Sequence, residues 1–311
     1  MDFELDDDQR EILGAVERLL ERHAGQPRAT ELAAKAEYDH ALDEALAGSG
    51  FDEMVDLESR SGVLEATLIV EAIARAAGVT SFATHALVAR AALGEALTGP
   101  VALSAGDPSA PIRFGADART LIRVDEDDAR VVPLEAGDAE RVASNFGYPL
   151  GRVTHDALAR GRALDAGSGA TLRRWWRLAI AAEAVGTMRA ALDCTVDYLK
   201  ERRQFGRPIG SFQAVQHRLA DCSVRVEGSR FLVYEAAHSR APEEATACAA
   251  AFALESARLL FRETHQLSGA IGFTREHPLH VWSMRLHALG SELEGVRGHR
   301  RALARARWGV S

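Results

Sequence analysis

Long helical patterns dominate the second half of this sequence and most constrain its fold. Residues 172–200 form a long amphipathic pattern, and residues 212–239 and 242–267 predict two further long helices. Glycines and prolines gather in the short segments between them, where they end helices. Successive amphipathic helices bury their apolar faces best against one another. We therefore expect residues 169–311 to form a four-helix bundle.

The first 98 residues also favour helices. Asp6 and Gln9 have the spacing of a capping box, in which each side chain satisfies a backbone N–H at the start of a helix. The apolar residues behind them recur at three- and four-residue spacing, as on one helical face. Further helices are predicted over about residues 31–46, 62–78 and 82–97. Residues 1–98 should therefore form an N-terminal helical domain.

Residues 99–168 have a different composition, with more glycine, proline and aspartate and with short apolar runs. Residues 121–124 and 131–134, separated by an acidic stretch, predict a β-hairpin, and residues 101–103 predict another strand. Because proline cannot donate to a strand ladder, Pro133 predicts an edge strand. We expect a small β domain of four to six strands, without the glycine-rich loop of a Rossmann domain. The predicted fold class is mainly α with a small β middle.

The overall charge excludes some functions. The 45 acidic residues outnumber the 37 basic ones, for a formal net charge of -8. Such a surface disfavours a phosphate backbone, so we expect no nucleic-acid partner. The acidic start is not a signal peptide, and charges interrupt every apolar stretch before it reaches the length of a membrane span. We expect a soluble cytoplasmic protein, and the cysteine and histidine spacings predict no metal site.

Two motifs near the C-terminus carry a specific resemblance. Residues 200–213 read KERRQFGRPIGSFQ, and residues 266–278 read QLSGAIGFTREHP. The first resembles the RxxFG motif, with its following glutamine, of acyl-CoA dehydrogenases, and the second resembles that family's QxxGGxGFTxEHP turn. The opening MDFELDDDQREIL is also similar to the family's N-terminus. The resemblance implies the family's fold, with a helical domain at 1–98, an abbreviated β domain at 99–168 and a helical bundle at 169–311.

The resemblance also implies a cofactor, FAD, because in the family these motifs contact the FAD of a neighbouring subunit. Arg202 would grip the pyrophosphate through charge-assisted hydrogen bonds. Phe205 would offer a flat apolar face beside a glycine, and Gln213 can both donate and accept hydrogen bonds. The same motifs imply contacts from Gln204, Gln266 and Gly269, although Ala270 replaces the second glycine of the turn. Without the family pattern, Arg202 would be a surface charge and Phe205 a core residue.

The β middle departs from the family pattern. The family carries a TExxxGSD segment that holds the flavin ring, and the matching stretch here is residues 101–108, VALSAGDP. This stretch keeps the strand and the proline but lacks the Thr-Glu and Gly-Ser-Asp elements. The resemblance therefore implies that this chain does not hold a flavin by its own fold alone.

The catalytic base is the second feature in which the chain departs from the family pattern. In the family a carboxylate removes a proton α to the thioester, often from a YEG(T/S) segment. Leu293-Glu294-Gly295, followed by Arg301, resembles that segment, so Glu294 is the candidate base. The alternative is an ordinary exposed carboxylate in a polar helix. Some relatives carry the base on the first bundle helix, where this chain has Trp176, with Glu183 two turns later.

A retained RRQFG motif beside a reduced β middle resembles the shortened subunit of heteromeric actinobacterial steroid-catabolic acyl-CoA dehydrogenases. The resemblance implies an α2β2 assembly with a full-length homologue, which would supply the flavin-side pocket and the base. It also implies steroid-derived CoA thioesters as substrates and an electron-transfer flavoprotein as acceptor. Two alternatives stay open: a self-sufficient homotetramer that uses Glu294, and a non-catalytic scaffold that keeps only the fold.

Overall fold

The computed structural model describes residues 4–59 and 62–309. Its N-terminal part consists of helices α1 (Asp7–His23), α2 (Gln26–Lys35), α3 (His40–Gly48) and α4 (Val63–Arg75), a short 3-10 turn η1 (Phe51–Glu53) and a π-helix η2 (Thr84–Leu93). The predicted capping box is confirmed at α1. The Gln9 N–H donates to Asp6 Oδ1 at 2.8 Å, and the Asp6 N–H donates to Gln9 Oε1 at 3.2 Å.

The single helix expected over residues 31–46 is wrong, because the chain forms two helices there. Helix α2 ends at Ala36, whose φ of 53° lies in the left-handed region. A new helix, α3, begins after Asp39, whose carboxylate accepts a hydrogen bond from the Leu42 N–H at 3.3 Å. Arg28 donates to both oxygens of this buried carboxylate, at 3.0 and 3.2 Å. The helix pattern therefore restarts because Asp39 is an N-cap.

Asp43 makes the stability of this helical part depend on pH. Burial raises the pKa of Asp43 from 3.8 to about 7, although the Tyr38 hydroxyl donates a 2.5 Å hydrogen bond to its carboxylate. The folded chain thus holds this proton more tightly than the unfolded chain. The contribution is fully present below about pH 4 and is lost as the pH rises to about 7. We expect Asp43→Asn to remove that loss.

Urea unfolding midpoints of the native chain and Asp43→Asn at pH 5 and pH 8 measure this effect. The native midpoint should fall more between the two pH values than the midpoint of the variant, which stays neutral at position 43. Parallel falls in the two proteins would show that Asp43 does not release a proton in this range.

The middle of the chain forms seven strands in two small sheets, rather than the four to six strands expected. Strands β1 (Val101–Ala105), β3 (Thr120–Val124), β4 (Ala129–Pro133) and β7 (Arg162–Ala163) form one sheet in the order β1-β3-β4-β7. Strands β2 (Ile112–Arg113), β6 (Leu150–Val153) and β5 (Ala139–Val142) form the other in the order β2-β6-β5. The predicted hairpin is confirmed as β3 and β4, and the predicted strand at residues 101–103 is confirmed as β1.

The edge-strand prediction from Pro133 is wrong for β4 as a whole. Strand β4 pairs with β3 on one side and, through Arg130 and Val131, with β7 on the other. The β7 pairing stops before Pro133, which pairs only with Thr120 of β3. The missing N–H of the proline therefore faces the open side of the strand, where no ladder bond is lost.

The last section forms the predicted helical bundle. It contains α6 (Ser168–Glu201), α7 (Gln213–His238), α8 (Glu243–Ser268), α9 (Leu279–Leu289) and α10 (Gly295–Trp308). Helix α6 runs through the middle and is buried along most of its length, packed on α4, α7, α8 and α9. It approaches α4 so closely at Gly186 that a Cβ there would lie 2.1 Å from the carbonyl oxygen of Glu71.

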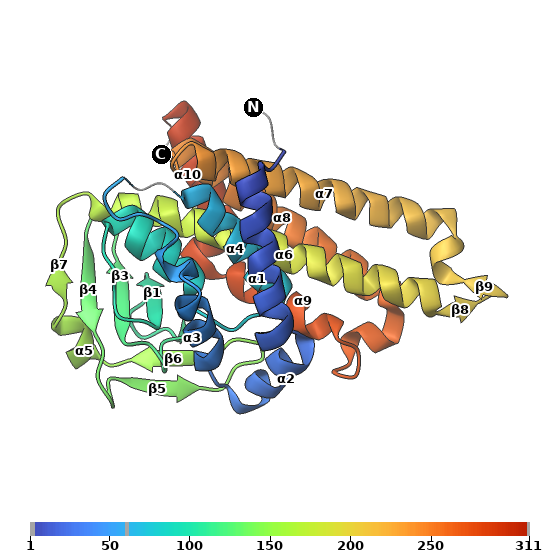
Figure 1. Cartoon of the computed structure of the whole chain (residues 1–311), viewed down its shortest axis with the longest axis horizontal. Coiled ribbons are helices and arrows are strands. Elements are labelled where there is room, and N and C mark those ends of the chain that lie inside the picture. Colours follow the sequence, from blue (N-terminus) through green and yellow to red (C-terminus); the bar gives the residue numbers. More distant parts are fainter. Residues whose placement is uncertain (1–3, 60–61, 310–311) are drawn as a thin grey trace.

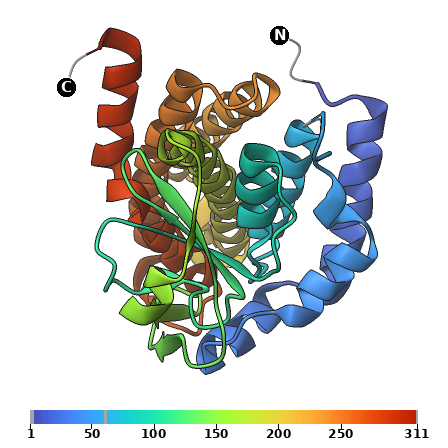
Figure 2. The same cartoon turned by 90° about the vertical axis from the view of Figure 1, so that its left-hand side faces the viewer.

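The two ends of the bundle carry different elements. Both sheets pack at one end, beside the first turns of α6, and a small hairpin projects at the opposite end (Figure 1). Seen from the sheet end, the N-terminal helices lie on one side of the bundle and α10 on the other (Figure 2). Within the described ranges, no helix is both long enough and apolar enough to cross a membrane.

Candidate functional site

The projecting hairpin presents the predicted RRQFG residues to solvent. It consists of β8 (Arg203–Gln204) and β9 (Arg207–Pro208), and it directly follows Arg202, the C-cap of α6. Phe205 turns the hairpin with a φ of 56° and is 89% exposed, so it is not a core residue. Arg202, Gln204 and Gln213 are exposed as well. Positive φ values at Phe205 and Gly206 are what a two-residue hairpin turn requires, and this turn places the phenylalanine at the tip of the hairpin.

The second predicted motif lies at the same end of the bundle (Figure 1). Gln266 is exposed in the last turn of α8, and Gly269 caps that helix with a φ of 68°. A Cβ on Gly269 would meet nothing within 4 Å, so its conformation, rather than crowding, favours glycine there. The edge contact between Tyr198 of α6 and His277, with ring centroids 4.9 Å apart, ties this turn to the helix that carries Arg202.

Glu294 lies far from that end, in an unusual turn between α9 and α10. Leu293, Glu294 and Gly295 have φ values of 48°, 65° and 61°, three left-handed residues in succession. Non-glycine residues seldom adopt this conformation. The Glu294 side chain is 61% exposed and forms an ion pair with Arg301 on the first turns of α10. The turn therefore directs a carboxylate outward from a constrained backbone.

Three hollows meet at Glu294. An apolar cavity of about 590 Å³ lies between β1, β2 and α6, with walls that include Leu103, Ile112 and Phe146. A second hollow of about 720 Å³ is lined by four arginines: Arg173, Arg177, Arg301 and Arg305. An open groove of about 940 Å³ runs along the start of α10. Glu294 lines all three, and it shares the boundary of the first two with Leu293.

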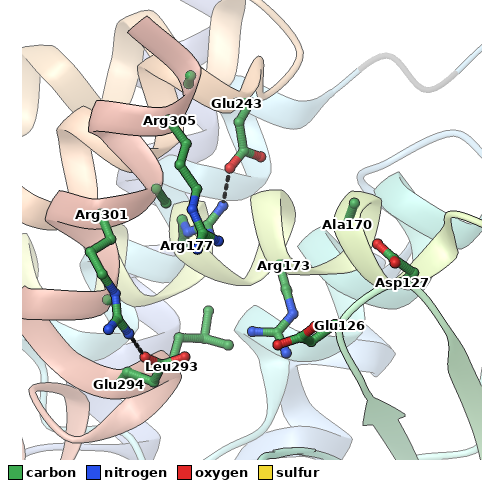
Figure 3. A pocket seen from close by; sticks show the side chains of 13 residues that line it. Glu126, Asp127, Ala170, Arg173, Arg177, Glu243, Leu293, Glu294, Arg301 and Arg305 are labelled. Carbon is green, nitrogen blue, oxygen red and sulfur yellow. Dashed lines mark hydrogen bonds and ion pairs between the residues drawn. The ribbon is translucent and has the colours of Figure 1, made fainter. Parts of the chain in front are cut away.

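Figure 3 shows how charge is arranged in the arginine-lined hollow. Arg301 reaches Glu294, and Arg177 reaches Glu243, with a nitrogen–oxygen distance of 2.6 Å in the second pair. The described residues supply no ion-pair partner for Arg305, and Arg173 donates only to the backbone oxygen of Asp125, at 3.1 Å. Two carboxylates, from Glu126 and Asp127, also line the hollow, and Figure 3 draws Glu126 on the same side as Arg173. The hollow thus has two arginines that no carboxylate neutralises directly.

A buried ion cluster forms the inner wall of the apolar cavity. Arg113 donates two hydrogen bonds to Glu183, at 2.5 and 2.8 Å, and its Nε lies 3.0 Å from Glu292. The Trp176 indole donates to the other oxygen of Glu292 at 2.6 Å. Burial raises the pKa of Glu292. Glu183 and Trp176, which sequence comparison offered as an alternative position for the base, thus act as partners in an ion-pair network.

Sequence reasoning missed Arg113 and Glu292. The sequence favours a polar, exposed segment around Glu294 as one alternative, but the neighbouring Glu292 side chain is only 16% exposed. The one available signal was the run Glu292-Leu293-Glu294, in which a buried leucine separates two carboxylates. Such a run can bury one of the two carboxylates and expose the other, but it does not show which of them is buried.

Residues at both ends of the bundle fit contacts to FAD. At the cavity, Ser104 occupies the stretch that matches TExxxGSD, and its buried hydroxyl has no hydrogen-bond partner among the described residues. A buried unpaired hydroxyl is costly unless a ligand completes it. At the opposite end of the bundle, Arg202 and Phe205 can reach only a ligand outside this chain.

Comparisons with known proteins find sequence relatives among the acyl-CoA dehydrogenases. Residues 172–305 match the family model "Acyl-CoA dehydrogenase, C-terminal domain". Acyl-CoA dehydrogenase IpdE2 of Mycobacterium tuberculosis is 41% identical over 129 residues, which cover 42% of this chain and 40% of IpdE2. Acyl-CoA dehydrogenase FadE34 of the same organism is 35% identical over 214 residues, which cover 66% of this chain and 29% of FadE34. The matched segments span less than half of either relative.

Solved structures show the same fold along the whole chain. The ChsE4-ChsE5 complex from Mycobacterium tuberculosis superposes with a TM-score of 0.78 at 22% identity, covering 98% of each chain. The Tcur3481-Tcur3483 steroid ACAD superposes with a TM-score of 0.77 at 24% identity, covering 96% of this chain and 97% of the other. The sequence match identifies residues 172–305 as an acyl-CoA dehydrogenase C-terminal domain, and the superpositions show that the chain shares its fold with these solved structures.

Proposed function

We propose that this chain is a subunit of an FAD-dependent acyl-CoA dehydrogenase that introduces an α,β double bond into a CoA thioester. The meeting of three hollows at Glu294 carries the proposal. The apolar cavity suits an acyl group, and the arginine-lined hollow suits the phosphates of the CoA tail. A thioester that spans the boundary between them would lie beside Glu294.

Glu294 would act as the base that removes the α-proton of the thioester. Bound FAD would supply the hydride acceptor for the β carbon. The Ser104 hydroxyl would hydrogen-bond to the flavin side of the site, and the apolar walls would keep water from the acyl group. Arg301, paired with Glu294, would hold the carboxylate at the boundary between the hollows.

The exposed hairpin supports a shared cofactor. Arg202, Phe205 and Gln213 would contact the adenine–pyrophosphate end of an FAD in a neighbouring subunit, with Gln266 and Gly269 along the same dinucleotide. We infer that the neighbour is a full-length homologue in an α2β2 assembly. The similarity to a complex of two differently named chains, ChsE4 and ChsE5, supports this inference. The similarity to a steroid ACAD supports a steroid-derived thioester, and family resemblance favours an electron-transfer flavoprotein as acceptor.

One observation favours a second candidate, in which the partner supplies the base and this chain supplies only the adenine–pyrophosphate contacts. The buried Arg113–Glu183–Glu292 cluster takes up space beside the apolar cavity, and Arg301 already neutralises Glu294.

Purification of the chain alone and with a full-length homologue tests the assembly. We expect flavin and turnover only in the co-purified complex. A yellow, active homotetramer of this chain alone would overturn the α2β2 proposal.

Arg305→Ala tests the use of the arginine-lined hollow. Removing an arginine that pairs with a substrate phosphate should raise KM for the CoA thioester about tenfold, with kcat nearly unchanged, because the contact is the same in substrate and transition state. Steady-state kinetics of the complex measure both constants. Arg307→Ala is the control, because Arg307 lies outside the hollow and pairs with Glu244 at 2.9 Å. Equal KM values in the two variants would place the CoA phosphates elsewhere.

A further inference from the structure

The Arg113 cluster joins three parts of the chain at one buried point. Arg113 comes from β2, Glu183 and Trp176 from α6, and Glu292 from the short 3-10 turn η5 (Glu292–Glu294) before α10. We propose that Arg113 is a positioning residue: through Glu292 it fixes the turn at residues 291–298 and thereby the direction of the Glu294 carboxylate. The catalytic consequence rests on the proposed function, but the effect on the turn does not.

The hydrogen bonds leave Glu292 little freedom to move. Arg113 Nε holds Oε1 at 3.0 Å, and the Trp176 indole holds Oε2 at 2.6 Å. Arg113 itself is fixed by its two bonds to Glu183, so its rigid guanidinium fork bridges the two carboxylates. The side chains of Arg113, Glu183 and Glu292 are 11%, 8% and 16% exposed. Water therefore cannot easily replace any one of these bonds.

The turn beyond Glu292 needs such an anchor. Leu293 and Glu294 adopt the left-handed conformation without the freedom of glycine. The first turn of α10 packs closely against them, because a Cβ on Gly298 would lie 2.2 Å from the Leu293 carbonyl oxygen. A Cβ on Gly295 would lie 2.5 Å from the Gly290 carbonyl oxygen on the other side. Because this backbone is unfavourable by itself, its shape depends on fixed neighbours.

Loss of Arg113 should act on this turn more than on the rest of the fold. Arg113→Met would leave Glu292 buried without its ion-pair partner, whereas Glu183 would keep an attractive charge interaction with the buried Arg285 of α9. Glu183 lies in the middle of a long helix, whereas Glu292 lies in a short irregular turn. Glu292 is therefore the carboxylate that can move toward water, and its movement would release Leu293 and Glu294.

Hydrogen–deuterium exchange of the purified complex measures the turn directly. We expect Arg113→Met to exchange the amides of residues 291–298 at least about tenfold faster than the native protein. Arg113→Lys keeps the charge but not the fork, so it should fold and show an intermediate rate. The control is Arg141→Met, which removes another two-bond arginine–carboxylate pair of the β section, with Asp117, away from this turn. Exchange within twofold of native in both Arg113 variants would overturn the proposal.

Kinetics separate this proposal from the proposed function. If Glu294 is the base, the Arg113 variants should lower kcat about tenfold or more at nearly constant KM, with lysine between methionine and native arginine. If the turn opens in the Arg113 variants while Glu294→Gln leaves turnover unchanged, Arg113 still positions the turn but Glu294 is not the base. If the turn stays closed while Glu294→Gln is inactive, the base is supported and the positioning role is refuted.

Discussion

Glu294→Gln is expected to lower turnover of the complex by about 10² to 10⁴-fold while its FAD content stays unchanged. The amide keeps the size of the side chain but cannot accept the α-proton, and a positioned general base contributes a factor of this order. The residue occupies the boundary of the apolar and arginine-lined hollows, so substrate binding should change little. Steady-state kinetics together with the flavin absorbance of the same sample measure both quantities.

Glu235→Gln is the matched control, because Glu235 is an exposed glutamate of the same bundle, on α7, that lines none of the three hollows. It should leave kcat and KM at native values. Native turnover in Glu294→Gln would assign the base to the partner subunit and favour the second candidate function. Loss of both flavin and turnover would instead indicate that the substitution damages the cofactor site.

Arg202→Ala should weaken FAD binding by the complex about 10- to 100-fold. A hydrogen bond between an arginine and a phosphate contributes roughly 1.5–3 kcal/mol, which corresponds to that range of dissociation constants. Arg202 is exposed at the end of α6, so its removal should not destabilise the fold. The ratio of flavin to protein after gel filtration, and a titration of the flavin-free complex with FAD, measure the loss.

Arg203→Ala is the control for this substitution. Arg203 is the next residue, lies on β8 of the same hairpin and carries the same charge, so the two variants have equal net charge. Successive side chains of an extended segment point to opposite sides, so only one of them should reach the pyrophosphate. Equal flavin retention in the two variants would show that the hairpin does not bind FAD through Arg202.

Local signals in the sequence predicted much of the fold. The capping box at Asp6 and Gln9 and the β3–β4 hairpin involve residues close in sequence, and both are confirmed. The helix expected over residues 31–46 failed because Asp39 is both an N-cap and the partner of Arg28, a pairing that helical periodicity does not show. Pro133 wrongly predicted an edge strand because the two-residue strand β7 pairs with β4 at Arg130 and Val131, away from the proline.

The site was predicted only in part, for a related reason. Motif resemblance offered Glu294 and the RRQFG hairpin as candidates, because each is a short contiguous segment. In the Arg113 cluster, the bonded residues Arg113 and Glu183 lie 70 positions apart in the sequence. Trp176 and Glu292, which are also bonded, lie 116 positions apart. No local pattern records such pairs, since each member alone is an ordinary arginine, tryptophan or glutamate. Only the tertiary fold brings β2, α6 and η5 together at this point.

The exposed Phe205 has a consequence for handling the protein. With 89% of its surface in water, and Phe273 72% exposed in the second motif at the same end, an unaccompanied subunit carries aromatic rings that a partner and its FAD would otherwise cover. Self-association of the isolated chain should therefore diminish as cofactor and partner are added. Light scattering during reconstitution would report assembly before any substrate is known.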